Sequence, residues 1–149
     1  MRVVAEPLSE TARRTTITLG LAGALPFVAV ATALWLAPIT EQPFLVQALL
    51  GYGAVILSFL GGSHWGRMLV TGSGGTTGLI AAVIPSLAGW LALLLPLGFD
   101  FATLVAAFLL VLALEQRVPA ARWYRRLRLI LTAIVCASLL AGWLPLALG

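Results

Sequence analysis

The stretch PFLVQALLGYGAVILSFLGGSHWGR, residues 43–67, decides the fold of this chain. It carries no charged side chain before Arg67, and it holds the only histidine of the protein, His64. An α-helix rises about 1.5 Å per residue, so about 20 such residues cross the hydrocarbon core of a bilayer. We therefore predict a membrane-spanning helix here, and we expect any specific chemistry of the protein in this region.

Small residues recur at every fourth position of this helix. Ala54, Ser58, Gly62 and Gly66 share one face, and a ridge of small side chains lets a second helix backbone approach closely in lipid. We predict that these four residues form a helix-packing surface. His64 lies about 200° around the helix from Gly62 and points to the opposite side. That side also carries Leu57, Leu60 and Gly61.

Composition places the whole chain in the membrane class. Of its 149 residues, 61% are hydrophobic and 9% are charged, and the mean hydropathy is +1.07. In soluble globular domains about a quarter of the residues are charged. The single cysteine, Cys136, excludes an intramolecular disulfide and a metal framework built on cysteines. We expect an all-α protein, a polytopic helical bundle with little chain outside the lipid.

Five apolar segments divide the chain. We predict a cytoplasmic N-terminal tail over residues 1–14, followed by a single transmembrane domain of five helices over residues 15–149. The predicted spans are about 15–36, 44–66, 78–96, 99–116 and 127–146. A signal peptide is a weaker interpretation of the first span, because the apolar run exceeds the usual core of roughly 7 to 15 residues. Asp100 is expected to cap the start of the fourth helix.

The arginines predict the orientation of the bundle. With a cytoplasmic N-terminus and an outside C-terminus, all nine basic residues fall on the cytoplasmic side, as the positive-inside rule requires. They are Arg2, Arg13, Arg14, Arg67, Arg117, Arg122, Arg125, Arg126 and Arg128. We expect a multi-pass protein of the bacterial inner (plasma) membrane, because the N-terminus does not have the composition of a transit peptide.

Two motifs carry a resemblance to a known family. The sequences LSFLGGSHWG (residues 57–66) and RWYRRLRLILT (residues 122–132) resemble the uncharacterised family known as domain of unknown function 3429, which is transmembrane protein 69-like. The resemblance covers essentially the whole chain and implies five spans joined by short loops, with no established activity. Members tend to carry prolines where this chain has Arg125 and Ile130, which predicts a more continuous helix here.

His64 and Trp65 are candidate ligand-binding residues. An imidazole can bind a metal or haem, relay protons or form a hydrogen bond with a quinone. The structural interpretation is favoured, however, because His64 lies one turn from Arg67 and a lone histidine cannot supply a site that needs two ligands. In that case the two side chains close the inner end of the bundle. We predict no metal site and no cofactor.

A basic cluster leads into the last predicted span. Its members are Arg122, Trp123, Arg125, Arg126 and Arg128. The cluster could contact anionic lipid headgroups or an acidic partner, but the positive-inside rule with general attraction to the membrane surface is the favoured explanation. We expect Glu115 to pair with one of these arginines. Nucleic acid is not expected as a partner, because membrane topology accounts for every basic residue.

Enzyme motifs are absent from the sequence. We find no Gly-rich loop followed by Lys, no HExxH, no paired catalytic carboxylates and no Ser–His–Asp set, and we expect no catalysis. The preferred function is an accessory or assembly subunit that packs against other subunits of a larger membrane complex, such as a respiratory complex. The family resemblance supports this choice, since its animal counterpart is mitochondrial. The alternative is binding or transport of a quinone, lipid or metabolite by His64 and Trp65.

Overall fold

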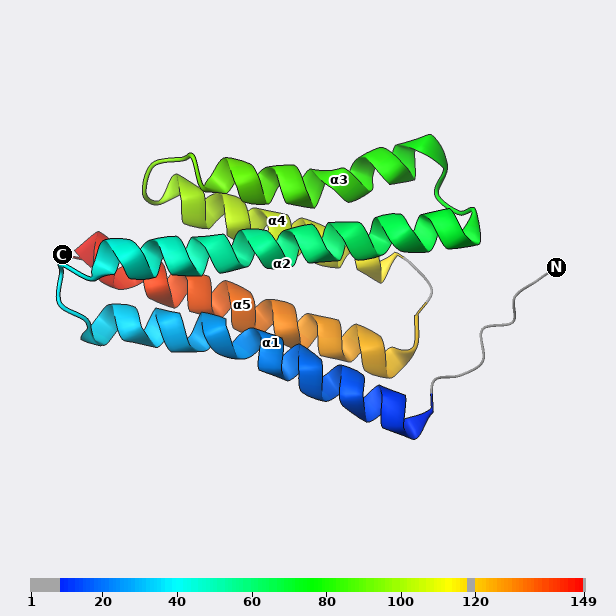
Figure 1. The fold of residues 1–149 in the computed structure, drawn as a ribbon, viewed down its shortest axis with the longest axis horizontal. Coiled ribbons are helices and arrows are strands. Elements are labelled where there is room, and N and C mark those ends of the chain that lie inside the picture. The colour runs from blue at the N-terminus through cyan, green and yellow to red at the C-terminus, as the bar shows by residue number, and fades with distance from the viewer. Residues whose placement is uncertain (1–8, 118–119, 149) are drawn as a thin grey trace.

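Five helices lie side by side along the long axis of the molecule, and each runs antiparallel to the one before it in the chain (Figure 1). The computed structural model describes residues 9–117 and 120–148, and no strand occurs within these ranges. The helices are α1 (Glu10–Leu36), α2 (Gln42–Thr71), α3 (Gly75–Ala92), α4 (Phe99–Gln116) and α5 (Arg122–Leu148). Each is long and apolar enough to cross a membrane. The predicted all-α bundle of five transmembrane helices is therefore confirmed.

The helices extend beyond most of the predicted spans. α1 begins at Glu10, so residues 10–14 of the predicted tail belong to the first helix, while residues 1–8 lie outside the described part of the chain. Ser9 caps this start, because its Oγ accepts a hydrogen bond from the Ala12 amide at 3.2 Å. Hydropathy marks only the apolar part of a helix, and a capped helix continues into the headgroup region.

The third and fourth helices show what ends and begins a span. α3 stops at Ala92, four residues before the predicted end, because the next residues tighten into i+3 hydrogen bonds ahead of Pro96. α4 matches the predicted span of residues 99–116. The N-cap residue of α4 is Gly98 rather than Asp100, which lies inside the first turn. The Oδ1 atom of Asp100 nevertheless accepts hydrogen bonds from the amides of Gly98 and Phe101 at 2.8 and 2.7 Å.

Glycine brings the backbones of α2 and α3 into contact. A Cβ atom on Gly61 of α2 would lie 2.5 Å from the carbonyl oxygen of Ala82 on α3. Further along the same interface, a Cβ on Gly89 would lie 2.9 Å from the Cα of Ala54. No side chain fits at either point, so this pair of helices is held by close packing of small residues, as is usual in lipid.

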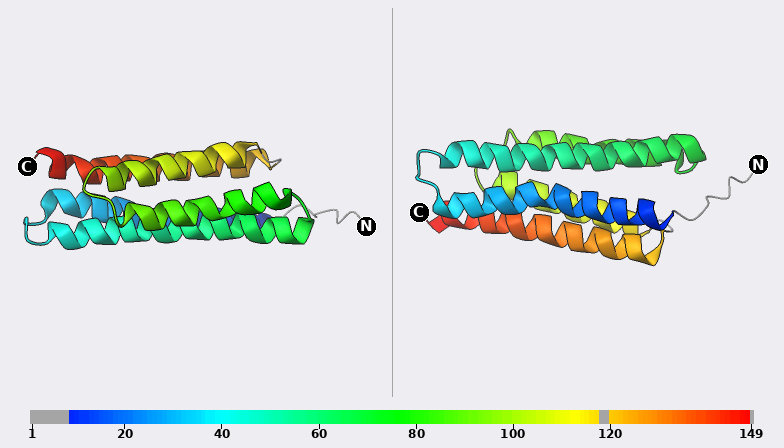
Figure 2. Two further views of the ribbon diagram at one scale, coloured as in Figure 1. Left: turned by 90° about the horizontal axis from the view of Figure 1, so that it is seen from above. Right: turned by 60° about the horizontal axis from the view of Figure 1, so that its bottom comes forward.

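The topology gathers the arginines at one end of the bundle. We call the end where α1, α3 and α5 begin and α2 and α4 end the arginine end (Figures 1 and 2). Every arginine among residues 9–117 and 120–148 lies on these helix termini or beside them, and Arg2 falls outside the described residues. The opposite end carries Glu41 and Asp100. The first residue of α1 and the last of α5 lie at opposite ends.

Candidate functional site at the arginine end

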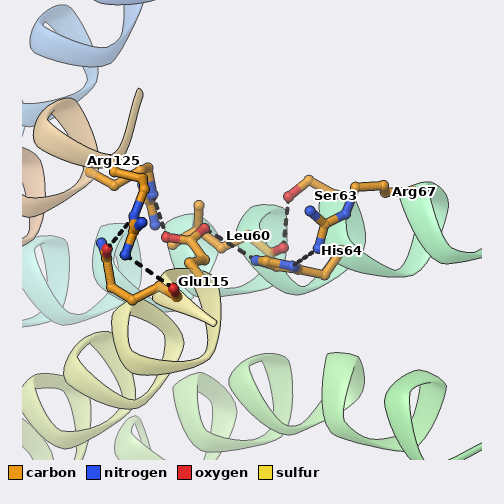
Figure 3. A network of polar contacts seen from close by, with 8 residues as sticks. Leu60, Ser63, His64, Arg67, Glu115 and Arg125 are labelled. Carbon is orange, nitrogen blue, oxygen red and sulfur yellow. Dashed lines mark hydrogen bonds and ion pairs between the residues drawn. The ribbon is translucent and has the colours of Figure 1, made fainter. Parts of the chain in front are cut away.

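A chain of polar contacts joins three helices at the arginine end (Figure 3). Glu115 of α4 is its centre. Its Oε2 accepts a hydrogen bond from Nε of Arg128 on α5 at 2.6 Å, and its Oε1 lies 3.1 Å from Nε2 of His64 on α2. The guanidinium of Arg67, one turn along α2, lies 3.2 Å from His64 Nδ1. The predicted pairing of Glu115 with an arginine of the basic cluster is thus confirmed, and the partner is Arg128.

These groups are largely removed from solvent. The side chains of Glu115, Arg128 and His64 are 8%, 11% and 17% exposed. A charge inside a transmembrane bundle is costly unless an opposite charge or hydrogen bonds compensate it. The carboxylate of Glu115 compensates the charge of Arg128 on α5 through Oε2, and its other oxygen, Oε1, contacts His64 on α2.

The contacts assign the tautomer of His64. Arginine can only donate hydrogen bonds, so Nδ1 of His64 must accept the one from Arg67. The proton of a neutral ring is then on Nε2, which donates to the carboxylate of Glu115. Both ring nitrogens are therefore engaged within the chain. His64 thereby links α2 to α4, and its structural role stays a prediction.

Helical periodicity separates His64 from Trp65. His64 lies on the buried face of α2, as predicted, together with Leu57, Leu60 and Gly61. Trp65 follows by about 100° of rotation, and its side chain is 40% exposed on the outside of the bundle. The two residues that the sequence pairs as a candidate site therefore do not face the same space.

The predicted packing ridge has little role within the chain itself. Of its four members only Ala54 is buried, where it meets Gly89, while Ser58, Gly62 and Gly66 are exposed. A Cβ on Gly62 or Gly66 would meet no other atom within 4 Å. The contacts inside the bundle are made instead on the neighbouring face. Its glycines are Gly53, which lies against Leu104, and Gly61, which lies against Ala82.

The basic cluster does not act as one patch. Arg128 points inward to Glu115, whereas Arg125 binds the end of α4 through the Gln116 side-chain oxygen at 2.9 Å and its carbonyl at 3.2 Å. Trp123 lies beneath Arg13 of α1, with the guanidinium carbon 5.5 Å from the ring centre. Three helices are thus joined through the cluster. Two further members, Arg122 and Arg126, are exposed.

Two cavities meet at His64 and Arg67. A polar cavity of about 170 Å³ is lined by Ser63, His64, Arg67, Glu115, Ala120 and Tyr124. A mostly apolar cavity of about 230 Å³ lies on the other side of His64, between α2, α3 and α4. Within residues 9–117 and 120–148, no three His, Cys, Asp or Glu side chains come together as a metal ion would require.

Comparison with known proteins gives the family. A family described as "Protein of unknown function (DUF3429)" matches residues 12–144. Transmembrane protein 69 of Xenopus tropicalis is 34% identical over 131 residues, which cover 83% of this chain and 51% of that protein. The chain thus spans about half the length of this curated relative. No solved structure matches significantly. Five membrane-spanning helices and a match over nearly the whole chain lead to one conclusion: the protein is a multi-pass membrane protein of the DUF3429 family.

Proposed function

We propose that this protein is a non-catalytic accessory or assembly subunit that packs against a larger membrane complex, such as a respiratory complex. The observation that carries the proposal is the outer face of α2, where Ser58, Gly62 and Gly66 are exposed. A residue that faces only lipid gains nothing from being so small. A helix of another subunit, however, could approach the backbone of α2 closely along this strip.

Large apolar side chains flank the strip of small residues. Val55, Phe59 and Leu69 are 61%, 69% and 62% exposed on the same side of α2. A partner helix that lies along the strip would bury these three side chains as well, which adds dispersion contacts to the close backbone approach. The occupant we expect is therefore a single transmembrane helix of a different subunit, with small residues of its own at the crossing point.

The experiment compares partner retention between matched variants. The Gly62→Leu/Gly66→Leu double variant should fold, since neither position has a neighbour within 4 Å, and should lose its partner. As a control, Ala102→Leu also replaces a small exposed residue with leucine, on α4, and this variant should retain the partner. Native mass spectrometry of tagged protein, gently extracted from its own membranes, reports the stoichiometric subunits. A wild-type chain without protein partners, or a double variant that keeps them, would refute the proposal.

We also propose that the arginine end is cytoplasmic, in a bacterial inner membrane. The one-sided distribution of the described arginines supports this orientation. In a Cys136→Ala background, a membrane-impermeant maleimide applied to intact cells should label Thr40→Cys, in the loop between α1 and α2. It should not label Ser73→Cys, between α2 and α3. Labelling of Ser73→Cys alone would reverse the orientation. In the proposed orientation, the exposed Arg122 and Arg126 contact anionic lipid headgroups at the cytoplasmic surface.

A second candidate function is the binding of a small molecule. The polar cavity of about 170 Å³, lined by His64, Glu115 and Tyr124 among others, favours it. Because both nitrogens of His64 already have partners, a ligand would have to displace one of them. Loss of a bound small molecule from His64→Ala, with the protein partners retained, would support this candidate. The Gly62→Leu/Gly66→Leu variant should instead keep the small molecule and lose the protein partners.

A further inference from the structure

The larger cavity beside His64 is apolar over most of its wall. It measures about 230 Å³ and lies at the arginine end between α2, α3 and α4. The α3 side is built from Gly78, Ala81, Ala82 and Pro85. Gly78 lies against Met68 of α2, and the two alanine side chains are too short to fill the space. Val111 and Leu114 of α4 complete an apolar surface. Such a wall suits a hydrocarbon chain better than a polar metabolite.

Two arginines from different helices also line this cavity. Arg67 comes from α2 and Arg117 follows the last residue of α4, and both are exposed. No carboxylate is among the lining residues. Glu115 lies on the other side of His64, where Arg128 already neutralises it. The cavity therefore combines an apolar interior with a cationic rim.

The rim is partly ordered before any ligand binds. Arg67 has five N–H donors and gives one of them to Nδ1 of His64, which holds the guanidinium at the edge of the cavity. A guanidinium so placed can bind a phosphate or carboxylate with its remaining donors. Because Arg67 is oriented in advance, less side-chain entropy is lost on binding.

We propose that this cavity binds one acyl lipid with an anionic head. The acyl chain lies against Gly78, Ala81 and Val111, and the head lies between Arg67 and Arg117. Basic pockets between transmembrane helices on the cytoplasmic side bind anionic lipid headgroups in this way. A phospholipid phosphate and a fatty-acid carboxylate share this chemistry. The site is separate from the outer face of α2 and does not depend on the accessory role.

Native mass spectrometry of the purified full-length protein in a mild detergent tests the site. The probes are phosphatidylglycerol, phosphatidylcholine with the same chains, and palmitate. Arg117→Gln should weaken binding of whichever anionic probe the wild type binds, phosphatidylglycerol or palmitate, about fivefold. The reason is that each arginine contributes ~1 kcal/mol of attraction. Arg126→Gln, an exposed arginine of the same end outside the cavity, should leave it unchanged. Ala81→Leu, which fills the cavity, should reduce binding of the same probe.

Each outcome decides a different point. Preference for phosphatidylglycerol over phosphatidylcholine identifies a phospholipid, and binding of palmitate alone identifies a fatty acid. Equal binding of the charged and neutral phospholipids, without palmitate binding, would overturn the proposal. So would equal effects of Arg117→Gln and Arg126→Gln, which would indicate diffuse surface attraction. If Ala81→Leu has the helical content of the wild type and still binds normally, the lipid lies elsewhere. The partner experiment on α2 is unaffected by any of these results.

Discussion

Replacing Glu115 with glutamine removes the charge that links α4 to α5 and keeps the shape of the side chain. The carboxylate is 8% exposed, and Arg128, 2.6 Å away, is 11% exposed. Removal of one partner from a buried ion pair commonly costs about 3–5 kcal/mol, because the other charge is left uncompensated. Arg128 lies near the arginine end and can extend its head group toward the interface, so we expect a loss near the lower limit, about 3 kcal/mol.

A matched control is available in the same chain. Glu10 also pairs with arginines, Arg13 and Arg14, but its side chain is 62% exposed, so Glu10→Gln should cost less than about 1 kcal/mol. Equilibrium unfolding in mixed micelles, followed by circular dichroism, gives the free energy of unfolding of each variant. The Glu115→Gln/Arg128→Gln double variant should recover part of the loss, because no buried charge remains unpaired.

The comparison can refute the reasoning directly. If Glu115→Gln and Glu10→Gln lower the free energy of unfolding equally, the buried pair does not stabilise the arginine end. Arg128→Gln provides the last comparison. If it lowers the free energy of unfolding as much in the Glu115→Gln variant as in the wild type, Glu115 and Arg128 are not coupled in the folded state.

Three further substitutions test the contacts of α2. Gly61→Ala should lower the free energy of unfolding by about 1–3 kcal/mol, because its Cβ would lie 2.5 Å from the carbonyl oxygen of Ala82. The neighbouring Gly62→Ala should be neutral or stabilising by up to about 1 kcal/mol, because its Cβ would have no neighbour within 4 Å. If Gly62→Ala were instead the less stable of the two variants in the same unfolding assay, Gly61 could not be the residue that meets α3. Tyr52→Phe should cost about 1 kcal/mol, since the hydroxyl donates to the carbonyl of Gly23 at 2.9 Å, and an unchanged stability would show that this bond contributes nothing.

The number and type of the elements could be predicted from the sequence. Every backbone polar group in lipid must be satisfied internally, so apolar runs of sufficient length become helices. The arginine motif of residues 122–132 was expected to be continuously helical, and α5 indeed begins at Arg122. The pairing of Glu115 with an arginine also followed, because a carboxylate near the end of a span needs a cation and the chain offers only arginines there.

The sequence by itself therefore determined the all-α class, the five spans and the gathering of arginines at one end. Only the tertiary structure decided that Gly61 rather than Gly62 meets α3, that Arg128 is the partner of Glu115, and that Trp65 faces outward. The physical reason lies in the solvent. Lipid is as apolar as the interior of the bundle, so the buried and outer faces of α2 have nearly the same composition. The rotation of each helix is then set by the fit between small and large side chains on neighbouring helices.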